Sequence, residues 1–145
     1  NASGASMKWT PIGASKPFAG TFDGQGHTIK GIRVENTAQY AGLFALSTKT
    51  TVIKNFVMAN SYIKSTQLNT GAVIGAFRGT LMENIKVSES VKIKGTGNLG
   101  GFVGILDSVS QVRTITGCWF AGEIYSTGQN IGGVFGRSWK GMNTV

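Results

Sequence analysis

The sequence predicts an all-β protein whose short strands coil into a parallel β-helix, or β-solenoid, of about four turns. Two kinds of segment recur in constant order, which is the mark of a solenoid repeat. Charged residues make up only 14% of the 145 positions, and glycine supplies 22 of them. Few charges suit stacked coils with buried inward positions, and glycine suits tight corners and close backbone approach.

The first kind of segment is a short apolar run bracketed by small residues. Its four copies start 30, 29 and 32 residues apart: 41–45 (AGLFA), 71–75 (GAVIG), 100–104 (GGFVG) and 132–136 (GGVFG). A continuous apolar run of this length is typical of a strand that is covered on both faces.

The second kind of segment alternates apolar and variable residues, as a half-buried strand does. Its copies are 29–34 (IKGIRV), 53–58 (IKNFVM), 82–87 (MENIKV) and 115–120 (ITGCWF). At about 4.8 Å per coil, four coils form a stub about 20 Å long. An all-β sandwich also has turns at this frequency, but it does not require a two-part repeat of constant order.

The two ends of the chain differ. Residues 1–18 carry Trp9, Pro11 and Pro17 and are expected to cap the first coil, and residues 19–145 form the repeats. The last repeat opens at 132–136 without its second segment. We therefore expect a fragment of a longer solenoid, or a last coil that docks on another chain, with an exposed edge near 131–136 and end-to-end self-association.

Charge and composition exclude several function classes. The 14 basic residues against 6 acidic ones give +8, but the basic residues are spread thinly and match no nucleic-acid-binding motif. No apolar run approaches the about 20 residues of a membrane span. One histidine and one cysteine leave few ways to build a metal site or a nucleophile–base pair. We expect no metal, no cofactor and no catalytic residue.

Two polar features have structural interpretations. Asp23 and His27 flank two glycines, which predicts a tight turn rather than an acid–base pair or half of a metal site. Asn55 and Asn84 occupy equivalent repeat positions and are expected to stack from coil to coil, linked by side-chain hydrogen bonds.

Cys118 aligns with Ile32, Phe56 and Ile85 at a position that is predicted to face inward. A buried free thiol behaves as a small apolar side chain, so we expect Cys118 to be an inert core residue.

The candidate ligand-binding residues follow from the same alignment. Trp119 is expected to point outward, in one column with Arg33, Val57 and Lys86. An exposed aromatic ring beside basic side chains suits a sugar ring or an anionic glycan. The next strand segment extends this face with one aromatic and three basic residues: Tyr125, Lys64, Lys92 and Lys94.

The motifs WTPIG at 9–13 and FAGTFDGQGHTI at 18–29, followed by the GLF and GGFVG segments, resemble the GLUG-motif repeat proteins. These are secreted or surface-anchored bacterial proteins, and they include adhesin-like chains and some described as immunoglobulin A peptidases. The resemblance implies an extracellular or cell-surface location and a β-helix-like fold with structural or binding repeats. The resemblance does not imply catalysis.

We therefore expect a non-catalytic extracellular module, either an adhesin-like surface for glycan or host-surface protein or a stalk. The alternative is part of a secreted enzyme, a peptidase or a β-helix polysaccharide-degrading enzyme, which needs paired carboxylates on one face. The acidic residues that would form such a pair are expected in different repeat phases: Asp23, Glu35, Glu83, Asp107 and Glu123. A purely structural spacer would have no ligand at all.

Overall fold

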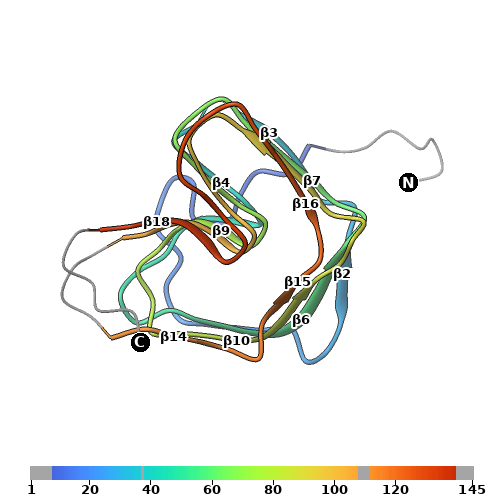
Figure 1. Cartoon of the computed structure of the whole chain (residues 1–145). Coiled ribbons are helices and arrows are strands. Elements are labelled where there is room, and N and C mark those ends of the chain that lie inside the picture. Colours follow the sequence, from blue (N-terminus) through green and yellow to red (C-terminus); the bar gives the residue numbers. More distant parts are fainter. Residues whose placement is uncertain (1–7, 37, 108–111, 140–145) are drawn as a thin grey trace.

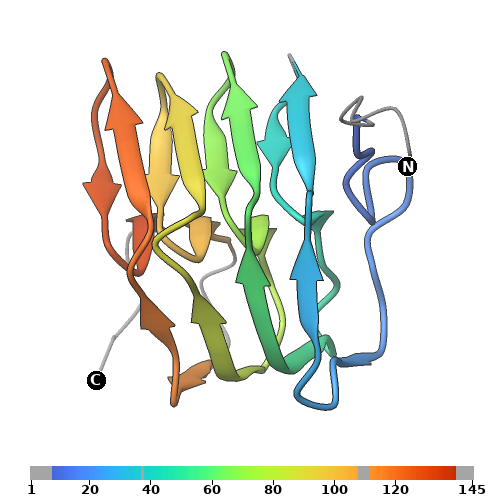
Figure 2. The ribbon, with the colours of Figure 1, turned by 90° about the vertical axis from the view of Figure 1, so that its right-hand side faces the viewer.

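The computed structural model describes residues 8–36, 38–107 and 112–139, and these residues form a parallel β-solenoid of about four coils. All the described secondary structure is β, with no helix. Every coil contributes to each of four parallel sheets, which we number I to IV in chain order (Figures 1 and 2). The predicted fold class is therefore confirmed.

Sheet I runs along one side of the solenoid, and its strands are β1 (Thr21–Asp23), β2 (Thr28–Lys30), β6 (Val52–Ala59), β10 (Leu81–Val87), β14 (Thr114–Thr116) and β15 (Trp119–Phe120). The middle two coils cross it in one long strand each, and the outer two coils in two short strands each. Ile53, Phe56 and Met58 all face the core although the first two are three residues apart. Asn55, which lies between Ile53 and Phe56, has a left-handed φ of 60°. This bulge adds one residue to the alternation, so that Ile53 and Phe56 both face inward.

Sheet II follows after a corner and contains β3 (Arg33–Asn36), β7 (Tyr62–Ser65), β11 (Lys92–Gly95) and β16 (Glu123–Ser126). Its strands alternate strictly between core and surface. Val34, Ile63 and Ile93 are fully buried, and Ile124 continues their column in the last coil. The residues on either side of each of these positions therefore form the outer face.

Sheets III and IV contain the apolar segments of the repeat. Sheet III is formed by β4 (Tyr40–Ala41), β8 (Asn69–Gly71), β12 (Asn98–Gly100) and β17 (Ile131–Gly132), and sheet IV by β5 (Phe44–Leu46), β9 (Ile74–Phe77), β13 (Val103–Leu106) and β18 (Phe135–Ser138). Strands β8, β9, β12 and β13 are buried at every position. These segments are thus covered on both faces, as their composition indicates.

Glycine recurs here because the two sheets approach each other too closely for a side chain. A Cβ on Gly75 would lie 2.7 Å from the backbone nitrogen of Ala41 and 2.8 Å from the Cα of Tyr40. Neither atom can move without moving a strand. The core itself is apolar and partly aromatic: the ring of Phe22 lies 5.3 Å from that of Phe44 and 5.6 Å from that of Phe56.

The register of the first coil differs from the predicted one. Val57 pairs with Thr28, not with Arg33, and Arg33 instead pairs with Tyr62 in sheet II. The cause is the turn at residues 24–27, which places four residues opposite the two residues Asn55 and Phe56. The apolar alternation of 29–34 therefore spans two sheets and the corner between them.

The same shift removes Ile32 from the predicted column of Cys118. Cys118 lies beside Ile85 of the preceding coil, because the residue pairs on either side of it are in register. Ile32 instead lies at the corner of the first coil, where its N–H donates a hydrogen bond to Ser61 Oγ. Cys118 is half-buried and packs against the core. Burial raises the pKa of its thiol, which fits an inert side chain.

Residues 8–20 lie along the free side of the first coil. Ile12 pairs with Phe44 and Phe18 with Ser47, and the indole Nε1 of Trp9 donates a hydrogen bond to the carbonyl oxygen of Leu43, at 3.1 Å. The segment thus occupies backbone groups of that coil's edge. Its role as a cap remains a prediction.

At the end of the solenoid formed by the fourth coil, side chains are exposed to solvent at positions where those of the third coil are buried. Ile131 is 53% exposed and its register partner Leu99 is fully buried, and Val134 is 42% exposed against 1% for Phe102. The predictions of a longer solenoid and of end-to-end association concern what covers this end, and they remain predictions. No described helix is long and apolar enough to cross a membrane.

Candidate functional site

The outer face of sheet I carries the tryptophan that the sequence singled out. Trp119 on β15 is 62% exposed and lies directly beside Lys86 on β10, which in turn lies beside Val57 on β6. Three of the four residues of the predicted column are therefore in register. The fourth position belongs to Thr28 instead of Arg33.

The other two predicted binding residues lie on sheet II, around the corner from Trp119. Arg33 is on the first coil, with its guanidinium 5.3 Å from the ring centroid of Tyr62 and an ion pair to Glu35. Tyr125 is on the fourth coil, 50% exposed. Three strand spacings, about 14 Å, separate the two coils. The four predicted residues thus form two faces, not one.

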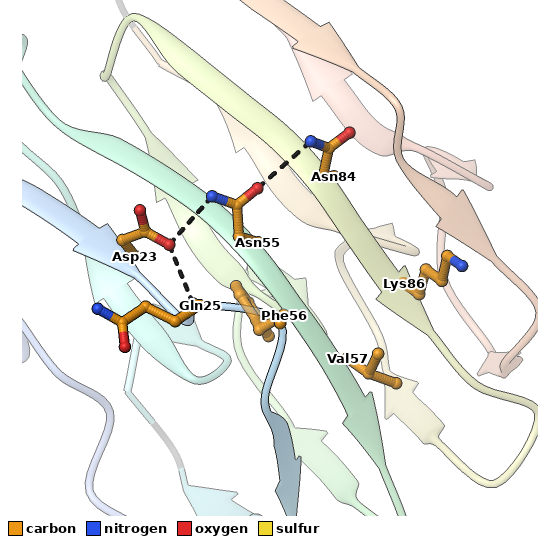
Figure 3. A pocket seen from close by; sticks show the side chains of 8 residues that line it. Asp23, Gln25, Asn55, Phe56, Val57, Asn84 and Lys86 are labelled. Atoms are coloured by element: carbon orange, nitrogen blue, oxygen red, sulfur yellow. Dashed lines mark hydrogen bonds between the residues drawn. The ribbon is translucent and has the colours of Figure 1, made fainter.

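A shallow pocket of about 440 Å³ lies on the outer face of sheet I, next to the Trp119 column (Figure 3). Lys86 and Val57 line it together with a row of polar side chains. Asn84 Nδ2 donates to Asn55 Oδ1 at 3.3 Å, and Asn55 Nδ2 donates to Asp23 Oδ1 at 3.0 Å. The predicted stacking of the two asparagines is confirmed, and Asp23 completes the row.

Glycine replaces asparagine at the same position of the fourth coil. Gly117 has a φ of 61°, close to the 60° of Asn55 and the 51° of Asn84, so all three share the left-handed conformation that asparagine and glycine tolerate best. A Cβ on Gly117 would collide with Oδ1 of Asn84. The carboxamide oxygen of Asn84 therefore lies close to Gly117, on the coil that carries Trp119.

The turn at residues 24–27 forms a wall of the pocket. In Figure 1 its light-blue trace lies outside the path of the coils stacked behind it. The N–H of Gln25 donates to Asp23 Oδ1 at 2.9 Å, and the N–H of His27 donates to the carbonyl oxygen of Gly24 at 2.8 Å. The predicted tight turn is confirmed. It also gives the pocket a polar side wall, which sequence reasoning missed.

Asp23 is held in its ionised form. The backbone N–H of Gln25 and then the amide of Asn55 lower the pKa of its carboxyl below 3.8, with a smaller contribution from the ammonium of Lys54, 3.5 Å away. A carboxylate of this kind accepts hydrogen bonds from ligand hydroxyls at neutral pH. It is poorly suited to act as a general acid.

One expectation about the acidic residues is wrong. Asp23 and Glu83 share a repeat phase, because both are in register with Lys54 on the strand between them. Their Cα atoms are therefore two strand spacings apart, about 10 Å. Lys54 stands between the two carboxylates, and only Asp23 lines the pocket. Among the described residues, no group of three or more His, Cys, Asp or Glu could hold a metal ion.

A second asparagine row, inside sheet III, was also missed. Asn98 Nδ2 donates to Asn69 Oδ1 at 2.7 Å, and Asn130 Nδ2 donates to Asn98 Oδ1 at 2.8 Å. Asn69 and Asn98 are buried. The signal was present, since an asparagine stands two residues before the glycine at 71, 100 and 132.

Comparisons of the chain with protein-family models, with curated proteins and with solved structures find no match.

Proposed function

We propose that this chain is a non-catalytic extracellular module of a secreted or cell-surface bacterial protein, and that the outer face of sheet I binds glycan. The observation that carries the proposal is the position of Trp119. Trp119 is 62% exposed, and it adjoins Lys86, which lines the pocket.

The chemistry of this face suits a sugar. An exposed indole offers a flat apolar surface for the C–H face of a sugar ring. The pocket offers planar amide and carboxylate groups, from Asn55, Asn84 and Asp23, that can form hydrogen bonds with pairs of sugar hydroxyls. Because the amides are tied to one another and to Asp23, they are already ordered before a ligand arrives, which reduces the entropic cost of binding.

The location and the adhesin-like role rest on the resemblance of the WTPIG and FAGTFDGQGHTI motifs to the GLUG-motif repeat proteins. Lys54 lies between Asp23 and Glu83 and pairs with Asp23, and Glu83 does not line the pocket, so this pair gives little support to the alternative of a carboxylate-pair enzyme. A stalk without ligand is the remaining alternative.

The test is an array of mucin, plant and acidic glycans probed with the wild-type protein at low and high salt. Trp119→Ala is the variant, and Trp139→Ala, at an indole that is 45% exposed elsewhere on the fourth coil, is the matched control. We expect binding that persists at high salt and weakens about tenfold or more in Trp119→Ala only. Loss with salt in all three proteins would reduce the effect to non-specific charge attraction. Absence of binding would favour the stalk.

A further inference from the structure

Sheet II carries an outer face of its own, distinct from the Trp119 face. Two outward columns run across its four strands in the direction of the solenoid axis. The first is Arg33, Tyr62, Lys92 and Glu123, and the second is Glu35, Lys64, Lys94 and Tyr125. Each column spans three strand spacings, about 14 Å.

The two carboxylates of this face already have cationic partners. Glu35 is paired with Arg33, and Glu123 with Lys92, where Nζ and Oε2 are 3.4 Å apart. Glu123 also accepts a hydrogen bond from the hydroxyl of Tyr125, at 2.5 Å. The negative charge of the face is therefore already engaged within the protein.

Lys64 and Lys94 remain. They face each other in register on neighbouring strands, about 4.8 Å apart at the backbone. Neither forms an ion pair with any carboxylate in the described part of the chain. Like charges directly opposite each other destabilise a sheet, and lysine is a poor strand former. Nothing in the packing of the core requires lysine at these outward positions.

We propose that the outer face of sheet II is a separate binding site for an acidic polysaccharide, with Lys64 and Lys94 as the anion-binding residues. A carboxylate or sulfate between the two ammonium groups would remove their repulsion. The exposed ring of Tyr125 continues the lysine column by one strand and is held in place by Glu123, so it offers a stacking surface for the adjoining sugar.

An acidic glycan suits this face better than a nucleic acid does. A nucleic-acid site typically neutralises six to ten phosphates, about that many cations being needed. Here the four cations and two carboxylates leave a net charge of only about two on a short face. A single-stranded oligonucleotide nevertheless belongs in the test, as the competing outcome.

The experiment measures binding of polygalacturonate, dextran sulfate, neutral dextran and an oligothymidylate at about 150 mM salt, where long-range attraction is screened. The variant is Lys64→Gln/Lys94→Gln. The control, Lys16→Gln/Lys30→Gln, removes the same charge from two exposed lysines outside sheet II. We expect the variant to bind one of the acidic polysaccharides at least about fivefold more weakly, the control to change less than about twofold, and Lys64→Arg/Lys94→Arg to retain binding.

Three results would overturn the proposal: equal loss in both double variants, no binding to either acidic polysaccharide, or stronger binding of the oligothymidylate with the same dependence on the two lysines. Trp119→Ala separates this proposal from the preceding one, because it should leave polygalacturonate and dextran sulfate binding unchanged. Since replacing both lysines removes the repulsion between them, the melting temperature of Lys64→Gln/Lys94→Gln should be at least that of the wild type. A lower value would contradict the repulsion on which the argument depends.

Discussion

The buried amide row of sheet III gives the sharpest test of the energetics, through its middle member. Asn98 donates to Asn69 Oδ1 and accepts from Asn130 Nδ2, and it is only 7% exposed. Asn98→Asp changes the side chain from donor and acceptor to acceptor only, with almost no change of shape. Asn98→Ala removes both functions.

The magnitudes follow from what each change leaves unpaired. Asn98→Ala removes two hydrogen bonds and strands the buried Oδ1 of Asn69, which costs about 2–4 kcal/mol. Asn98→Asp keeps the bond from Asn130. At neutral pH, however, it places an unpaired charge in a buried site, directly against the oxygen of Asn69, and we expect a cost of about 3–5 kcal/mol.

The sign of the pH dependence distinguishes the two variants. Burial raises the folded-state pKa of the introduced carboxyl above its unfolded value of about 3.9, so the folded state binds the extra proton first. The deficit of Asn98→Asp relative to wild type is therefore largest above the folded pKa. It shrinks as pH falls toward about 4, where the protonated carboxyl can donate to Asn69. The deficit of Asn98→Ala should not change in this way.

Urea unfolding of wild type and both variants at pH 7 and pH 4 measures these differences. Asn84→Asp is the control, because Asn84 occupies the exposed row and should cost less than about 1 kcal/mol. The reasoning is refuted if Asn98→Asp is as stable as wild type at pH 7, or if its deficit is the same at both pH values.

Three further predictions concern close packing, an unpaired hydroxyl and a titrating carboxyl. Gly75→Ala should destabilise the fold by about 1–3 kcal/mol or more in thermal unfolding, because its Cβ would meet strand backbone, whereas Gly133→Ala, with nothing within 4 Å of the added Cβ, should change stability by less than about 1 kcal/mol. Thr70→Val should increase the free energy of unfolding by about 1 kcal/mol and raise the melting temperature, because the buried Oγ1 of Thr70 has no hydrogen-bond partner. A lower melting temperature would contradict this. The pKa of Asp23, followed by NMR, should lie below its ordinary value of 3.8 and should rise in Asn55→Ala, and an unchanged pKa in Asn55→Ala would exclude the hydrogen bond as a cause. The stability that the lowered pKa contributes is present above the pKa of the unfolded state, and it is lost as the pH falls through the pKa of the folded state.

The repeat itself was enough to predict the fold. The apolar segments at 71–75 and 100–104 and the strand-like segments at 53–58 and 82–87 have equal spacing, and the structure stacks them in register. In these middle coils each residue lies between residues at the equivalent repeat position of the two adjoining coils. Local pattern and tertiary environment therefore agree, and the pattern alone predicts which side chains are buried.

The first coil shows where pattern reasoning fails. The segment 29–34 has the right alternation, but the turn at 24–27 moves it along the coil, so Arg33 lies beside Tyr62 instead of Val57. The turn at 24–27 holds two more residues than the next coil has at this place, and no local feature of 29–34 indicates this insertion. Alignment by apolar spacing could not detect the shift, and the candidate binding surface was consequently drawn as one face.

The binding-site chemistry was predicted in part. Exposure of Trp119 beside Lys86 follows from the middle-coil register, and it is present. The pocket beside it depends on the outward course of the turn at 24–27 and on Asp23 joining the asparagine row. Those features arise from the irregular coil, and period-2 patterns carry no information about them.

The division of the predicted binding residues into two faces depends on the register of the first coil, so its most direct test is a disulfide scan of the first two coils in a Cys118→Ala background. Paired residues on neighbouring strands lie about 4.8 Å apart at the backbone, within the range that a disulfide spans. Arg33→Cys/Tyr62→Cys should form an intramolecular disulfide in high yield on mild oxidation, as detected by mass spectrometry of the proteolysed protein, and Arg33→Cys/Val57→Cys should not. Efficient cross-linking of the second pair and failure of the first would contradict the register, and with it the division of the surface into two faces.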